Sequence, residues 1–120
     1  MTLTPEKVQS WLDRYIAAWR SNDAAKIGAL FTEDVVYRFR PFEDPVIGRA
    51  AVVAAWLESP DEPDSWDADY KVWAVTDDRA ATVGRTTYTE GSVFHNTFLL
   101  RFRDGACCEY TEWWIQEPED

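Results

Sequence analysis

Cys107-Cys108-Glu109-Tyr110-Thr111-Glu112-Trp113-Trp114-Ile115-Gln116 is the stretch that decides the fold. Its alternation is typical of a strand, which places Tyr110, Glu112 and Trp114 on one face and Glu109, Thr111, Trp113 and Ile115 on the other. Because each face carries a tryptophan, we expect neither face to be left bare to water. Glu112 has aromatic neighbours on its own face and is therefore the leading candidate for chemistry.

The composition predicts one globular domain over residues 1–120, since 46% of the residues are hydrophobic and the chain is long enough for one core. Aromatic residues make up 15% and include seven tryptophans, more than a small core normally uses. Either a bulky core with a subunit interface or an aromatic-lined cavity explains this excess. The two explanations are compatible.

The charge and the cysteines exclude several classes of function. A net charge of −10 argues against binding to nucleic acid or to an anionic membrane surface. Two adjacent cysteines and a single histidine, His95, do not make a zinc site. No glycine-rich phosphate loop is visible, and we expect no cofactor. With no signal peptide and no long apolar run, we expect a cytoplasmic protein with reduced cysteines.

The remaining segments follow in an α+β order. Thr4-Pro5 predicts the start of a helix with an apolar stripe from Val8 to Trp19, and Asp23 caps a short second helix. A strand over Val35–Arg40 and a third helix around Val52–Leu57 come next. Turn residues then separate the strands, which are predicted over Trp66–Thr76, Ala80–Thr89, Val93–Phe102 and the closing stretch.

Several motifs in this order carry a resemblance to a known family: Arg14-Tyr15-Ile16, Asn22-Asp23, Leu30-Phe31-Thr32-Glu33-Asp34-Val35, Pro45-Val46-Ile47-Gly48-Arg49 with Trp56, and Phe102-Arg103-Asp104-Gly105 with Glu112-Trp113-Trp114. Together they resemble the nuclear transport factor 2-like superfamily, in its SnoaL-like and steroid-isomerase-like branch. The resemblance implies a cone-shaped, curved antiparallel sheet wrapped around three N-terminal helices, a cystatin-like roll. It also implies a pocket at the open end and dimers through the outer sheet. Family members include isomerases, cyclases, dehydratases and proteins that catalyse nothing, so the fold does not fix the function.

The resemblance carries over to only part of the steroid-isomerase site. Tyr15 matches the tyrosine that donates to the developing oxyanion, and Trp114 matches a pocket tryptophan. Phe39 stands where those enzymes have their general-base aspartate, and Phe98 where they have a second carboxylic acid. With two of the three catalytic groups missing, the resemblance argues against steroid isomerisation by that route. Glu112 lies in the strand region where polyketide cyclases of this fold place an acid–base carboxylate.

The register of the last hairpin decides which residues adjoin Glu112, because a slip of one residue exchanges the faces of a strand. A two-residue Asp104-Gly105 loop sets Thr97 opposite Glu112. A three-residue loop that adds Arg103 sets Asn96 opposite Glu112, Phe98 beside Tyr110 and Phe94 beside Trp114. We prefer the three-residue loop, since it makes an apolar cavity wall.

Three functions then compete: a cofactor-independent acid–base enzyme (isomerase, cyclase or dehydratase type) acting on a small, largely apolar molecule, a non-catalytic binder of such molecules, and a dimerisation module. The enzyme would use Glu112 as acid or base, with Tyr15 and Asn96 as hydrogen-bond donors. The predicted pocket residues are Trp19, Tyr37, Phe39, Trp56, Tyr88, Phe98, Tyr110 and Trp114. The predicted homodimer face is the outer face of the sheet, with His95, Thr97, Leu99, Trp113 and Ile115.

Overall fold

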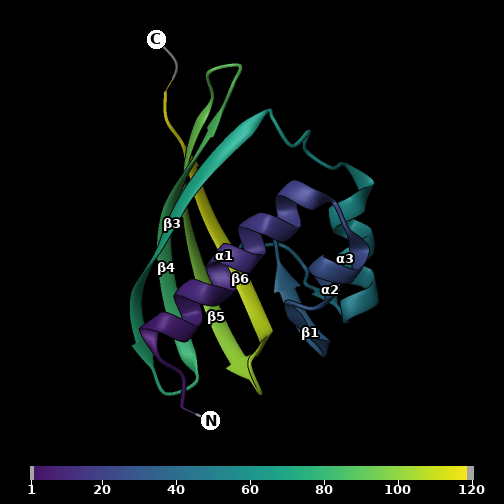
Figure 1. Cartoon of the computed structure of the whole chain (residues 1–120), viewed down its shortest axis with the longest axis vertical. Coiled ribbons are helices and arrows are strands. Elements are labelled where there is room, and N and C mark those ends of the chain that lie inside the picture. The colour runs from purple at the N-terminus through teal and green to yellow at the C-terminus, as the bar shows by residue number, and fades with distance from the viewer. Residues whose placement is uncertain (1, 119–120) are drawn as a thin grey trace.

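A computed structural model describes residues 2–118 as three helices and one six-stranded sheet (Figure 1). The elements are α1 (Pro5–Ser21), α2 (Ala24–Gly28), β1 (Phe31–Arg38), β2 (Val46–Ile47), α3 (Arg49–Glu58), β3 (Trp66–Thr76), β4 (Arg79–Tyr88), β5 (Val93–Arg103) and β6 (Ala106–Gln116). The sheet has the order β2-β1-β6-β5-β4-β3 and is antiparallel except for the parallel pair β1–β6. The predicted α+β class, with a curved sheet wrapped around helices, is confirmed.

Helix α1 forms where its sequence signals predict it. The Thr4 hydroxyl oxygen accepts from the backbone N–H of Lys7 at 3.2 Å, Pro5 occupies the first turn, and Asn22 ends the helix in the left-handed conformation. The buried stripe consists of Val8, Trp11, Leu12, Tyr15 and Ala18. It covers the concave face of β3–β6, which the ribbon shows curving behind the helix (Figure 1). The C-terminal half of α1 therefore delivers Tyr15 and Trp19 to the upper end of the fold.

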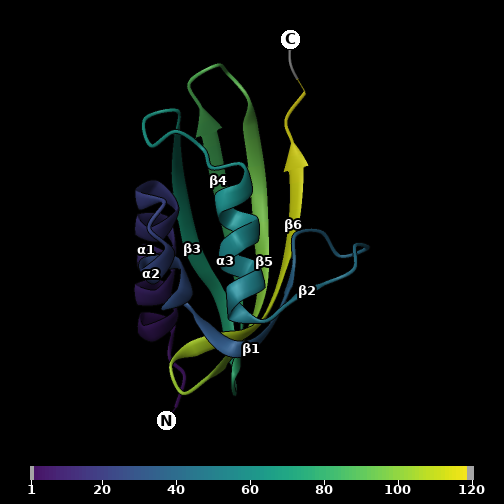
Figure 2. The ribbon, with the colours of Figure 1, turned by 90° about the vertical axis from the view of Figure 1, so that its right-hand side faces the viewer.

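Helix α3 closes the other side of the concave face. It packs against α2 and β1, and it stands in front of β4 and β5 when the molecule is turned (Figure 2). Val52 is its one fully buried residue, whereas Trp56 is half-buried and points toward the sheet. Within residues 2–118, no helix combines the length and the apolar character needed to cross a membrane.

The predicted register of the last hairpin is wrong, although the predicted faces are right. Arg103 pairs with Ala106, so that the loop has only two residues, Asp104 (φ 53°) and Gly105 (φ 83°). A β-bulge then makes Cys108 an extra residue, because Phe102 pairs with Cys107 while Arg101 pairs with Glu109. The bulge compensates for the shorter loop and restores the predicted faces.

The direct partners consequently differ from those expected. Phe98 lies opposite Glu112, and Asn96 lies opposite Trp114; Phe94 lies opposite Gln116. Asn96 is thus the diagonal neighbour of Glu112, on the same face. The five residues of the predicted outer face do share that face, where Trp113 is 52% and Ile115 is 72% exposed.

Strand β1 begins four residues before the predicted start. Its first residue, Phe31, pairs with Cys107 in parallel, and the backbone N–H of Cys107 donates to the Leu30 carbonyl at 2.9 Å. Phe31 is buried in the core, and Tyr37 faces the same interior further along the strand. The sequence gives no local signal for this parallel pairing, because its two partners lie more than 70 residues apart.

Candidate active site

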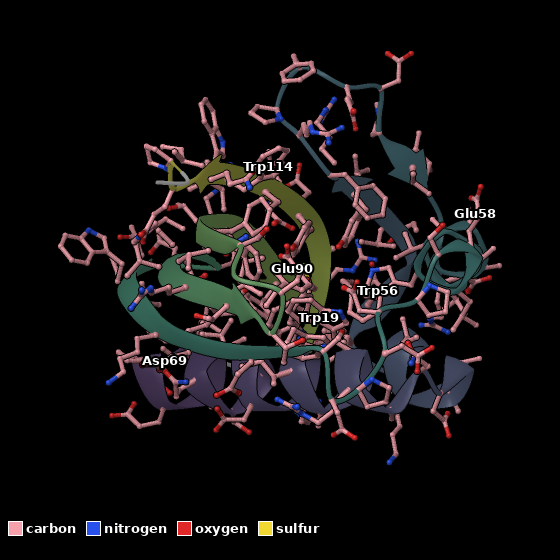
Figure 3. The ribbon with its side chains drawn as sticks, turned by 90° about the horizontal axis from the view of Figure 1, so that it is seen from above. Trp19, Trp56, Glu58, Asp69, Glu90 and Trp114 are labelled. Carbon is pink, nitrogen blue, oxygen red and sulfur yellow. The ribbon has the colours of Figure 1, made fainter. Side chains whose placement is uncertain are left out.

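A cavity of about 400 Å³ opens at the upper end of the curved sheet. This volume lies within the range of small-molecule sites. Seen from above, Trp19, Trp56 and Trp114 gather around the middle of this end with Glu90, whereas Glu58 and Asp69 lie at the edges (Figure 3). The predicted residues that line the cavity are Tyr15, Trp19, Tyr37, Phe39, Trp56, Tyr88, Asn96, Glu112 and Trp114.

Two predicted pocket residues do not line the cavity. Phe98 and Tyr110 are each 1% exposed and lie behind its wall, packed against Tyr15. The Tyr110 ring also stacks on the Tyr37 ring with centroids 4.0 Å apart and an angle of 4° between the planes. These residues therefore form the floor that supports the lining, rather than the lining itself.

Glu112 projects from the middle of β6 into the cavity and receives a hydrogen bond on each carboxylate oxygen. The Tyr110 hydroxyl donates to Oε1 at 2.8 Å, and the Asn96 amide donates to Oε2 at 2.9 Å. A carboxylate held at both oxygens has one defined orientation, so that its remaining lone pairs face a fixed direction.

The hydrogen bond from Tyr110 is the last of a longer chain of hydrogen bonds. The hydroxyls of Tyr15 and Tyr110 lie 3.1 Å apart. Because Tyr110 uses its own proton toward Glu112, Tyr15 is the donor in this pair. The first chain therefore runs from Tyr15 through Tyr110 to Oε1 of Glu112.

A second chain reaches the other oxygen from β3 and β4. The Tyr70 and Thr86 hydroxyls are hydrogen-bonded, and Thr86 donates to the side-chain amide oxygen Oδ1 of Asn96 at 3.0 Å, which makes Tyr70 the first donor. The Asn96 amide then donates to Glu112. Both Thr86 and Asn96 are buried, so each of their polar groups needs such a partner.

Gly84 allows Tyr70 to start this second chain. The two residues are cross-strand partners, and a Cβ atom on Gly84 would lie only 1.8 Å from Cδ1 of the Tyr70 ring. The ring therefore lies directly over the glycine and reaches Thr86 two residues further along β4. Glycine in a strand interior is unfavourable by itself, and here it marks a close approach.

The environment of Glu112 sets its protonation. Burial raises the pKa of this carboxyl above its ordinary value, while the hydrogen bonds from Tyr110 and Asn96 and the charge of Arg40 oppose that rise. Burial likewise raises the pKa of Tyr15 and Tyr110 well above that of an ordinary tyrosine. The tyrosines thus stay neutral as donors, and Glu112 is the carboxyl group of this network that can exchange a proton.

Other residues of the lining were not among the predicted site residues, and three of them form side-chain hydrogen bonds to predicted ones or to one another. Tyr70 and Thr86 belong to the second chain, and Asp61 lines the cavity from the loop after α3. Asp61 Oδ2 accepts from the indole N–H of Trp19 at 3.1 Å and from the Tyr88 hydroxyl at 3.4 Å. Asp61 lies in a loop with other acidic residues, among them Glu62 and Asp64, so no local signal distinguishes it from its neighbours.

Two sequence features lie away from the cavity. His95 is exposed on the outer face, where its Nε2 lies 2.6 Å from the Glu117 carboxylate. Cys107 and Cys108 are free and buried at the bulge, and burial raises the pKa of both thiols. Over the described range 2–118, no three His, Cys, Asp or Glu side chains are grouped as a metal site would require.

Comparison with known proteins identifies the family. The family model of the SnoaL-like domain matches residues 12–110, and the chain therefore belongs to the SnoaL-like family of the nuclear transport factor 2-like superfamily. No curated protein sequence matches the chain.

Several solved structures are similar to the chain. A putative ketosteroid isomerase from Kribbella flavida is 20% identical with a TM-score of 0.75, over 97% of this chain and 83% of that one. An NTF-2 like protein of unknown function from Burkholderia xenovorans is 16% identical with a TM-score of 0.76, over 96% and 88%. Bal32a, from a soil-derived mobile gene cassette, is 18% identical with a TM-score of 0.72, over 92% and 91%. At these identities the likeness shows the fold alone.

Proposed function

We propose that the chain is a cofactor-independent enzyme that transfers a proton on a small, largely apolar molecule, with Glu112 as the acid–base group. One observation carries this proposal: Glu112 is a carboxylate with a raised pKa that lines an aromatic cavity and is oriented at both oxygens. An efficient acid–base group needs a pKa near the working pH and a fixed direction toward its substrate.

In the proposed reaction, Glu112 takes a proton from a carbon next to an electron-withdrawing group and returns it to the same or another atom. The aromatic walls hold the substrate and exclude water, which strengthens the electrostatic interactions inside. Tyr15 and Asn96, expected as donors to the substrate, already donate within the two chains that end at Glu112. We therefore assign them the positioning of the carboxylate. A single group of this kind gives a rate enhancement of about 10²–10⁴-fold.

The alternative is a non-catalytic binder that uses the same cavity. It is favoured by one observation: each oxygen of Glu112 already accepts a hydrogen bond, as in a purely structural carboxylate. A binder would hold apolar molecules without changing them, whether or not residue 112 is an acid.

Deuterium exchange separates the two functions. The wild-type protein is incubated in D₂O with 2-tetralone, a compact aromatic ketone with acidic C–H groups, and exchange is followed by NMR. The proposal expects exchange above the buffer rate that falls at least about 100-fold in Glu112→Gln. The matched control Glu109→Gln changes an exposed carboxylate on the same strand and should keep the full rate. Equal rates for all three proteins would refute the acid–base role, and binding of 2-tetralone without exchange would support the binder.

We also propose that two copies associate through the outer face of the sheet in the cytoplasm. The face is apolar where it is exposed, with Leu99, Trp113 and Ile115 beside Val83. Sedimentation should report a dimer for the wild type and a monomer for Trp113→Lys, with Trp73→Lys on the edge strand β3 as a comparison. A monomeric wild type at micromolar concentration would refute this part.

A further inference from the structure

We infer that the ligand of the cavity carries a positive charge: a small aromatic or alicyclic amine in its protonated form. This inference rests on the proposed site, since it names the class of molecule that the site accepts. It comes from the charges of the cavity lining, the aromatic walls and the position of the nearby cations.

The charged side chains inside the cavity all have the same sign in the described part of the chain. Within residues 2–118, the only charged side chains that line the cavity are Glu112 and Asp61. Both are acidic, and neither has a lysine, arginine or histidine beside it in the lining. An anionic ligand would therefore meet repulsion from two carboxylates in a partly dehydrated space, where electrostatic effects are strong.

Tyr88, whose hydroxyl donates to Asp61 at 3.4 Å, lies in the electrostatic field of several carboxylates. Burial, Asp61, Glu112 and Glu90 together raise the pKa of Tyr88 to about 12. Carboxylates from three separate segments thus act on one hydroxyl of the cavity wall. Their fields add and make the opening a region of negative potential, which raises the local concentration of cations.

The rest of the cavity lining is largely aromatic. Trp19, Tyr37, Trp56, Phe94 and Trp114 present rings to the cavity. The face of an aromatic ring attracts a cation, and this attraction increases when the cation is removed from water. An aromatic enclosure with acceptor carboxylates is suited to an ammonium group, because the rings take its alkyl part and the carboxylates take its N–H donors.

The nearby arginines do not reverse this picture. Arg40 lies over the Trp114 ring at 5.0 Å and is paired with Glu43 at 2.7 Å. Arg20 lies over the Trp66 ring at 4.4 Å and is paired with Asp67 at 3.3 Å. Neither arginine lines the cavity, and each has its own carboxylate partner. The charge of Arg40 does reach Glu112, where it lowers the pKa of the carboxyl and so favours its negative form. The contact of Arg40 also places a cation against Trp114, one of the rings of the lining.

Three indoles of one size test the inference. Tryptamine is a cation, tryptophol is neutral and indole-3-propionate is an anion, and their affinities are measured by titration calorimetry at low salt. We expect tryptamine to bind at least about tenfold more tightly than tryptophol, and indole-3-propionate to bind most weakly. Asp61→Asn and Glu112→Gln should each reduce the preference for tryptamine while the affinity for tryptophol stays within about twofold.

The control variant is Glu62→Gln, which removes a carboxylate next to Asp61 that does not line the cavity. It should leave the preference unchanged. Equal binding of tryptamine and tryptophol would overturn the inference but leave the proposed pocket intact. Failure of all three indoles to bind would overturn both the inference and the apolar pocket on which it rests.

Discussion

Replacement of Gly84 by alanine tests the packing that supports the site. The added methyl group would lie 1.8 Å from Cδ1 and 2.6 Å from Cγ of Tyr70, and 2.7 Å from the Asp69 carbonyl oxygen. The first two atoms belong to the packed Tyr70 ring and the third to the backbone of β3, so neither the ring nor the strand can move away easily. Overpacking of this kind costs about 1–3 kcal/mol. Displacement of Tyr70 from Thr86 adds about 1 kcal/mol for the lost hydrogen bond.

The expected loss in the free energy of unfolding is therefore about 2–4 kcal/mol, measured by urea denaturation. Gly28→Ala is the matched control, since a Cβ there meets only ordinary contacts at 3.5 Å or more. A double-mutant cycle with Tyr70→Ala isolates the ring contact and should give a coupling of about 0.5–3 kcal/mol, with Gly84→Ala costing less when the ring is absent. A cost below about 0.5 kcal/mol for Gly84→Ala in the wild-type background would refute the close approach of the Tyr70 ring to Gly84. It would also refute the hydrogen-bond series that starts at Tyr70 and ends at Glu112.

The remaining predictions concern Glu112, Tyr110 and Thr4. The raised pKa of Glu112 means that the folded state binds this proton more tightly than the unfolded state does. The stability of the wild type relative to Glu112→Gln should therefore fall as pH rises above about 4.5, by at most about 1.4 kcal/mol per pH unit. Urea denaturation from pH 4 to 8 measures it, and a constant difference between the two proteins would contradict the raised pKa. Tyr110→Phe removes one donor to the carboxylate and should raise the pKa of Glu112 further, as followed by NMR; an unchanged pKa would argue against the first chain. Thr4→Ala should cost about 1 kcal/mol in the free energy of unfolding through loss of the helix cap, with Thr2→Ala as the neutral control, and equal stabilities would argue against the cap.

Much of the fold could be predicted because its signals are local. Thr4-Pro5 and Asp23 cap helices, and Asp104-Gly105 makes a tight turn. Alternating apolar residues then mark each strand. The parallel pairing of β1 with β6 has no such signal, since it brings together residues that are distant in the chain and depends on the assembled core.

The register of the β5–β6 hairpin could be predicted only in part from its turn residues. Turn residues predict a loop length, but the bulge at Cys107–Cys108 depends on how the curved sheet packs, and no residue type announces it. The preferred loop length was wrong by one residue, and the bulge inserted one residue, so the face of Glu112 came out as predicted. The residue directly opposite Glu112 is Phe98 and not the predicted Asn96.

The candidate site was predicted in part for the same reason. Glu112 and Asn96 lie on adjacent strands of one hairpin, where alternation places them together. Tyr70 and Thr86 come from the next hairpin, and their chain exists only because Gly84 leaves room for a ring. Asp61 reaches the cavity from a loop, where sequence patterns say little about direction.

The protonation of Glu112 is the central claim, and a site-resolved titration measures it directly. The side-chain carboxyl carbon of Glu112, labelled with ¹³C and assigned by its disappearance in Glu112→Gln, is followed by NMR from pH 3 to 9. A midpoint clearly above 4.5, the ordinary value for glutamate, is what burial in the aromatic cavity predicts. A midpoint at or below 4.5 would mean that Tyr110 and Asn96 hold a permanently ionised, structural carboxylate.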